Sequence, residues 1–197
     1  MRILIVALLI QVSCHEKKIE SDPDLNKANS LLSKYLITGD REYLVRSYDV
    51  IKSRKNSDRQ VMAKSQFVLV SSILMYLRKY PDLKVLVNQN GAFVRDKQLT
   101  LNLIEALQVW PQDSGKALRY IDSNIAQIDK QINDKPTDSL LYVDYFIMRL
   151  YRFGRPEVLA ELDSFKTKDT IFSFVFHDQV LRDVIEEYPD DFLFPAK

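Results

Sequence analysis

The sequence contains few of the residues from which catalytic and metal sites are usually built. Its 197 residues include one cysteine, two histidines and four glycines. A single cysteine cannot form a disulfide within the chain, and His15 and His177 fall short of the three or four ligands of a usual zinc site. The sequence has no glycine-rich phosphate loop and no Gly-x-Ser-x-Gly motif. We therefore predict no catalytic residue, no metal and no cofactor.

The chain also lacks an excess of charge of either sign. It has 28 basic and 27 acidic residues, which gives a formal net charge of +1. Proteins that bind nucleic acid or an anionic membrane surface through bulk electrostatics carry a clear positive excess. We therefore do not expect nucleic acid among the partners of this protein.

One uninterrupted apolar run stands at the very start of the sequence. Arg2 is followed by the apolar residues Ile3 to Ile10, and Gln11-Val12-Ser13 then precede the lone Cys14. The run is far shorter than the roughly 20 residues that a membrane-spanning helix needs. A positive charge, a short apolar core and a small or polar end are typical of a secretory signal peptide. Residues 1–13 are therefore predicted to direct export and to be removed.

Val12-Ser13-Cys14 behind this run resembles the cleavage site of bacterial lipoprotein precursors, although Gln11 replaces the usual apolar residue of the motif. The resemblance implies cleavage before Cys14, attachment of a diacylglycerol and of fatty acids such as palmitate to this residue, and a lipidated tether over residues 14–22. It implies a location in the bacterial cell envelope, on the periplasmic or surface side. The outer membrane is favoured, because His15 replaces the Asp that retains such proteins at the inner membrane in some bacteria. The alternatives are an ordinary signal peptide that is cut elsewhere and an N-terminal membrane helix.

The remainder, residues 23–197, has the pattern of a single all-α domain. Glycine is scarce and apolar residues recur at three- and four-residue spacings, which favours amphipathic helices. The first helix is expected to begin at Pro23, with Ser21 or Asp22 as its N-cap, and to end at Gly39. Further helices are expected at about 41–53, 58–79, 81–88, 93–110 or 97–110, 114–135, 139–153, 157–165 and 170–188, followed by an aromatic tail at 189–195 that folds back on the domain.

Two helix-turn-helix segments resemble tetratricopeptide repeats. The matching residues are Ala28, Leu31, Tyr35, Gly39, Asp40, Tyr48 and Ile51 in the first segment, and Phe146, Leu150, Gly154 and Leu159 or Ala160 in the second. Leu32 and Leu44 depart from the small residues that the repeat prefers at these positions. The resemblance implies stacked antiparallel helical hairpins, arranged as a degenerate tetratricopeptide-like solenoid or, alternatively, as an irregular helical bundle.

Both segments are rich in aromatic residues. The candidates for a partner-binding surface are Tyr35, Tyr43, Tyr48, Tyr142, Tyr145 and Tyr151. Tyrosine is enriched at interfaces because it brings a large contact area at a low cost in conformational entropy. Packing in the core between helices is the alternative for each of these side chains.

Together these features predict a lipid-anchored adaptor or assembly factor, not an enzyme, that binds a protein or peptide through a helical-repeat surface. A lipoprotein immunity factor that neutralises a secreted toxin is the alternative among binding proteins. An envelope hydrolase that uses His177 and nearby carboxylates such as Glu187 is the alternative of another class. The neighbouring Glu186 and Glu187 do not favour it, because adjacent side chains on a helix point about 100° apart.

Overall fold

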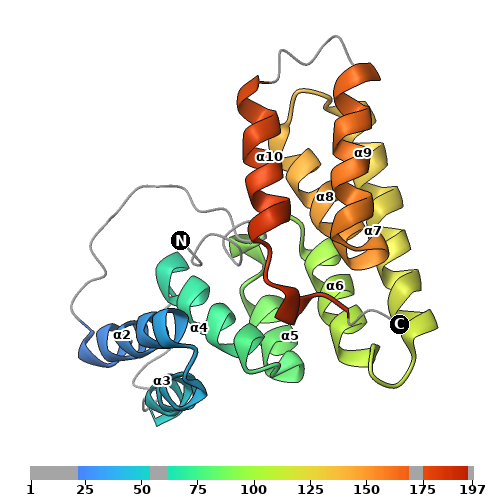
Figure 1. Ribbon diagram of the computed structural model, residues 1–197. Helices are drawn as coiled ribbons and strands as arrows, with labels where there is room; N and C mark the ends of the chain where they lie inside the picture. The colour runs from blue at the N-terminus through green and yellow to red at the C-terminus, as the bar shows by residue number, and fades with distance from the viewer. Residues whose placement is uncertain (1–21, 54–61, 169–174, 195–197) are drawn as a thin grey trace. The chain divides into compact units, whose positions relative to one another are not determined.

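The computed structural model describes residues 22–53, 62–168 and 175–194 (Figure 1). Every regular element in these ranges is an α-helix or a short 3-10 helix, which confirms the all-α prediction. Cys14, the predicted signal peptide and all of the tether except Asp22 lie outside the described residues, as do the helix starts predicted near 58 and 170.

The chain groups into two compact units, residues 1–104 and 105–197. The sequence had indicated one domain over residues 23–197, because helical periodicity continues without a Pro-rich or Gly-rich linker. The boundary falls within helix α6, Lys97–Val109, so no change of composition marks it. Each unit is described by itself below.

The first unit begins with helices α2, Pro23–Thr38, and α3, Arg41–Ser53, as predicted. The Asp22 side chain accepts hydrogen bonds from the backbone N–H groups of Asp24 and Leu25, at 2.9 and 3.2 Å. Gly39 ends α2 with φ +73°, a left-handed conformation that glycine adopts without steric cost. The Asp22 bonds give N–H groups of the first turn a hydrogen-bond partner, and Gly39 allows the turn that ends the helix. Both ends depend on residues that are close in sequence, so both could be predicted.

Small side chains allow α2 and α3 to approach closely. The Ser47 hydroxyl donates a hydrogen bond of 2.7 Å to the Ala28 carbonyl, and both residues are fully buried. Near the turn, the Lys34 ammonium lies 5.7 Å from the centre of the Tyr43 ring. Ala28 contacts Ser47 and Lys34 contacts Tyr43, so α2 and α3 form an antiparallel hairpin.

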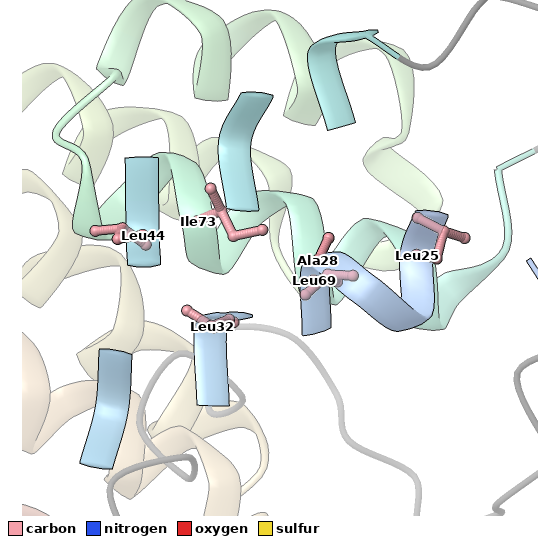
Figure 2. Close-up of a cluster of buried hydrophobic side chains, with 6 residues drawn as sticks. All are labelled: Leu25, Ala28, Leu32, Leu44, Leu69 and Ile73. Carbon is pink, nitrogen blue, oxygen red and sulfur yellow. The ribbon is translucent and has the colours of Figure 1, made fainter. Parts of the chain in front are cut away.

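Helix α4, Lys64–Tyr76, closes the core of this hairpin. Figure 2 shows the core cluster, which consists of Leu25, Ala28, Leu32, Leu44, Leu69 and Ile73. Leu69 and Ile73 come from α4 and the other members from the hairpin. Helix α4 is therefore largely buried, as expected for a helix that is apolar on nearly all sides.

Helix α4 is shorter at both ends than the predicted 58–79. Met62 and Ala63 are not helical, and the Ala63 N–H bonds instead to the Gln66 side chain at 3.3 Å. At the other end Arg78 has φ +56°, while the N–H groups of Arg78 and Lys79 bond to the carbonyls of Met75 and Leu74. This is a Schellman ending with arginine in the position usually held by glycine. Residues 80–93 follow as α5, Tyr80–Gln89, and the 3-10 turn η1, Gly91–Phe93.

The second unit contains helices α7, Ser114–Asp134, α8, Ser139–Phe153, α9, Arg155–Lys168, and α10, Val175–Glu187. Pairs of contacting residues show that each helix runs antiparallel to the one before it. The pairs are Asp122 with Arg152 and Asn124 with Met148 for α7 and α8, Tyr142 with Phe165 and Arg149 with Glu161 for α8 and α9, and Arg155 with Tyr188 and Asp163 with Arg182 for α9 and the end of α10. Helix α8 packs against α7, α9 and α10 (Figure 1). The resemblance to a tetratricopeptide repeat implied that α8 pairs with α9. In the structure α8 packs along α7 as well.

The chain after α10 folds back onto the second unit, as the sequence indicated. It forms the 3-10 turn η2, Asp190–Phe192, and continues to Phe194. The Phe194 ring stacks on Trp110, with centroids 3.9 Å apart and planes within 1°. Phe192 is buried. We call residues 189–194 the C-terminal clasp.

Candidate partner-binding site

Helix α8 presents a partly exposed row of aromatic and arginine side chains. Tyr145, Arg149 and Phe153 lie four residues apart, so they share one face of the helix. Arg152 stands beside the end of the row. The other sides of α8 are almost completely buried in the core of the second unit. We call Tyr145, Arg149, Arg152 and Phe153 the aromatic-arginine face.

Two guanidinium groups contact the Phe153 ring. The central carbon of the Arg149 guanidinium is 4.1 Å from the centre of the Phe153 ring, and that of Arg152 is 5.1 Å from it. Phe153 is nevertheless 41% exposed, so part of the ring remains open to solvent. Each cation–π contact at such a site contributes about 0.5–1 kcal/mol, which fixes the ring without covering it.

Both arginines are held by carboxylates of neighbouring helices. The Nε and one terminal nitrogen of Arg149 each lie 2.8 Å from Oε2 of Glu161 on α9. Oε1 of Glu161 accepts a hydrogen bond of 3.0 Å from the Tyr145 hydroxyl. On the other side, Arg152 Nε donates to Asp122 of α7 at 2.7 Å. The face is therefore ordered by contacts with both flanking helices.

Burial and charge set the protonation of this cluster. Burial, reinforced by the nearby Glu161 carboxylate, raises the pKa of Tyr145 to about 12. Burial also raises the pKa of Asp129, on the adjacent part of α7, and Glu161 adds to this while the Arg149 charge opposes it. Near neutral pH Tyr145 therefore keeps its proton and remains a hydrogen-bond donor. A tyrosine in this state serves as an anchor and is unsuited to act as a general base.

The three candidate tyrosines of the first unit are half-buried and already in contact with neighbours. Tyr35 packs edge-on against Tyr76, with ring centroids 5.3 Å apart. The Tyr48 hydroxyl donates to Asp82 at 3.2 Å, and the Lys79 ammonium lies 4.6 Å above its ring. Tyr43 is the ring that Lys34 approaches. Tyr35 and Tyr48 pack against the α2–α3–α4 core, and the role of all three tyrosines in partner binding stays a prediction.

The three candidates of the second unit, all on α8, differ sharply in exposure. Tyr142 is 4% exposed and donates to the Pro136 carbonyl at 3.1 Å. Tyr151 is 3% exposed, and its hydroxyl lies 2.8 Å from that of Tyr188. Both side chains pack in the core, which was the alternative to partner binding for each of them. Tyr145 is the one that α8 brings to the aromatic-arginine face.

Of the residues of the hydrolase alternative, the structure describes the side chains of the α10 carboxylates but not that of His177. Glu186 and Glu187 are exposed on α10, and Glu186 pairs with Arg182 at 3.7 Å. His177 is in α10, but its side chain lies outside the described residues. Among the described residues no group of three or more His, Cys, Asp or Glu side chains could hold a metal ion. Within the same ranges no helix has the length and apolar character needed to cross a membrane.

The chain was compared with protein-family models, with curated proteins and with solved structures. None of them matches it. A function for the protein is therefore inferred from its own residues.

The aromatic residues Tyr145 and Phe153 stand out in the sequence, whereas Arg149, Arg152 and Glu161 were not among the predicted candidates. The spacing of Tyr145, Arg149 and Phe153 was a usable signal, because residues at i, i+4 and i+8 share a helix face. The partner on α9 carried no such signal, since Glu161 lies twelve positions away from Arg149. Only the packing of α9 on α8 brings these two together.

Proposed function

We propose that the protein is a lipid-anchored component of the bacterial cell envelope that binds a protein or peptide through its helical surface, as an adaptor or assembly factor without catalysis. The anchor rests on the sequence Val12-Ser13-Cys14 behind the apolar run. The binding role rests on the aromatic-arginine face of α8.

The observation that carries the binding role is the exposed Phe153 ring in contact with Arg149 and Arg152. Aromatic and arginine side chains are the types most enriched among residues that dominate binding energy. Their rotamers are already fixed by Glu161 and Asp122, so little conformational entropy remains to be lost on binding. An ordered aromatic surface of this kind suits a protein partner.

The charges of the face favour a protein over nucleic acid. Arg149 pairs with Glu161 and Arg152 with Asp122, so each guanidinium has a neighbouring carboxylate. A phosphate backbone needs an excess of unpaired positive charge, which this cluster does not offer. A partner surface with an aromatic or aliphatic side chain to cover Phe153 fits better.

The partner role is tested by capture from solubilised membranes with the full-length tagged chain. A specific partner should be retained by the wild type and by Val180→Ala, and its affinity should fall by about tenfold or more with Phe153→Ala. Val180 is a matched control because it is an apolar residue of the second unit with a similar exposure of 39%. Capture that is not saturable, or that is equal for Phe153→Ala and the wild type, would contradict the proposal.

The anchor is tested separately by fractionation. Cys14→Ser should move the protein from the membrane to the soluble envelope fraction and abolish incorporation of labelled palmitate. Palmitate incorporation that is unchanged in the variant, or absent from the wild type, would exclude lipid attachment at Cys14 and would leave the partner test unaffected.

A further inference from the structure

Two side chains of the C-terminal clasp, four positions apart, contact other parts of the second unit. A carboxylate oxygen of Asp190 lies 2.9 Å from a terminal nitrogen of Arg155. Phe194 stacks on Trp110 and also meets Tyr151 edge-on, with centroids 5.3 Å apart and planes at 64°. One charge and one ring thus fix the register of the segment, which is how short peptide motifs dock on folded domains.

The residues that receive the clasp are held in place by other contacts. Arg155 donates from Nε to the Ile185 carbonyl at 3.0 Å and from a terminal nitrogen to the Tyr188 carbonyl at 2.5 Å. These bonds join the start of α9 to the end of α10 and do not involve residues 189–194. Tyr151 is likewise held by the hydroxyl of Tyr188. Arg155 and Tyr151 are therefore held by contacts that lie outside residues 189–194.

The two fastening contacts lie at the surface. The side chain of Asp190 is 80% exposed, and exposed ion pairs contribute only about 0–1 kcal/mol. Trp110 and Phe194 are each partly exposed. Phe192 is the member of the clasp that reaches the core, with 7% exposure. Contacts of this kind can be exchanged for equivalent contacts from another chain.

We propose that Trp110, Tyr151 and Arg155 form a recognition site for a partner segment that carries a carboxylate and, four residues later, an aromatic ring. The clasp occupies this site as an intramolecular ligand, and its own sequence shows which chemistry fits: Asp190 complements the guanidinium and Phe194 covers the indole. The site uses other residues than the aromatic-arginine face, so it is a second interaction surface.

An intramolecular ligand weakens the binding of its competitor. A segment tethered by a few residues acts at an effective concentration of the order of millimolar. A partner segment must displace it, so the affinity observed with the intact clasp is lower than the affinity of the open site. Loss of the clasp's aromatic side chains should therefore increase binding of a segment supplied from outside.

The test uses the full chain and a synthetic peptide, Asp-Asp-Phe-Leu-Phe, which copies residues 190–194. Trp110 is the only tryptophan in the chain, so its fluorescence reports on the stacked ring directly. The peptide should bind the double variant Phe192→Ala/Phe194→Ala at least tenfold more tightly than the wild type, with Phe194→Ala intermediate. A peptide whose last residue is alanine should not change the Trp110 signal.

The result that would overturn the proposal is equal peptide affinity for the wild type and both variants, with their helical circular dichroism unchanged. Equal binding of the alanine peptide would overturn it as well. If the double variant fails to fold, Phe194→Ala alone decides the question, because Phe194 is not a buried core residue. Phe153→Ala should bind the peptide like the wild type, so the outcome is independent of the proposed function.

Discussion

Helices α2 and α3 of the first unit and helices α8 and α9 of the second unit are connected by different contacts. In the first unit, α2 and α3 approach through the small residues Ala28 and Ser47, and the surrounding cluster is aliphatic. In the second unit, side chains that bridge the helices are large, aromatic or charged, as with Tyr145 and Arg149 on Glu161. Close contact through small residues leaves little for a partner to bind. Bridging by long side chains leaves rings and charged groups at the surface, and both candidate binding sites lie in that unit.

The same difference predicts where single substitutions have the largest effect. An aliphatic core loses stability when the volume of a buried side chain changes. Helices joined by polar side chains also lose stability when a hydrogen bond or ion pair between them is removed. Substitutions in both units can test this distinction.

Phe146→Ala should destabilise the second unit by about 3–5 kcal/mol, because it removes a large buried ring. Phe146 is 1% exposed and packs edge-on against Tyr145 and Phe165, with ring centroids 5.4 and 6.3 Å away. Hydrogen exchange of peptides from α8 and α9 measures the loss. Ile37→Ala, at a residue 83% exposed, serves as the control and should change stability by less than about 0.5 kcal/mol.

Arg155→Ala should cost about 2–3 kcal/mol, because it removes two charged hydrogen bonds to carbonyls at the end of α10. Asp190→Asn removes only the exposed ion pair and should cost at most about 1 kcal/mol. Chemical denaturation followed by circular dichroism compares the two. Equal effects would show that Arg155 acts through the clasp alone and not through the end of α10.

Ser47→Ala should cost about 1 kcal/mol in the first unit, since one buried hydrogen bond is lost while the Ala28 carbonyl remains in its helix. Ser53→Ala is the matched control, because the Ser53 hydroxyl bonds to a carbonyl of its own helix in an exposed position. Hydrogen exchange in α2 and α3 distinguishes them. If the two variants are equally stable, the close contact depends on packing alone.

Tyr145→Phe should cost about 1 kcal/mol near neutral pH, and this difference should shrink at high pH. The pKa of Tyr145 is 10.0 unperturbed and about 12 in the folded protein. Above pH 10 the unfolded chain ionises while the folded one does not, so the contribution of the hydroxyl to stability is present below pH 10 and is lost as pH rises toward 12. Urea unfolding of both proteins at pH 8 and pH 11 measures it, and a constant difference would contradict the assignment.

Helix ends with a local cause were predictable, and features caused by packing were not. Asp22, Pro23 and Gly39 act within a few residues of themselves, and the structure confirms the helix they delimit. Arg78 could not be predicted, because arginine rarely adopts a positive φ and nothing in its neighbours indicates one.

The candidate site was predictable only in part, for a related reason. Helix α8 is apolar on most of its sides, so the positions of its tyrosines do not by themselves define which side faces out. Tyr145 and Tyr151 therefore looked equivalent, although one is partly exposed and the other buried. The clasp was predicted to fold back, but its partners Trp110 and Arg155 come from distant parts of the chain.

The turn at Gly39 has a practical consequence for studies in the cell. A side chain built at Gly39 would meet no atom within 4 Å, and the flanking Thr38 and Asp40 are exposed. A short glycine-flanked protease site inserted there should leave both helices intact, because exposed turns tolerate insertions. Its cleavage by an added protease in whole cells or in spheroplasts would show on which side of each membrane the folded part resides.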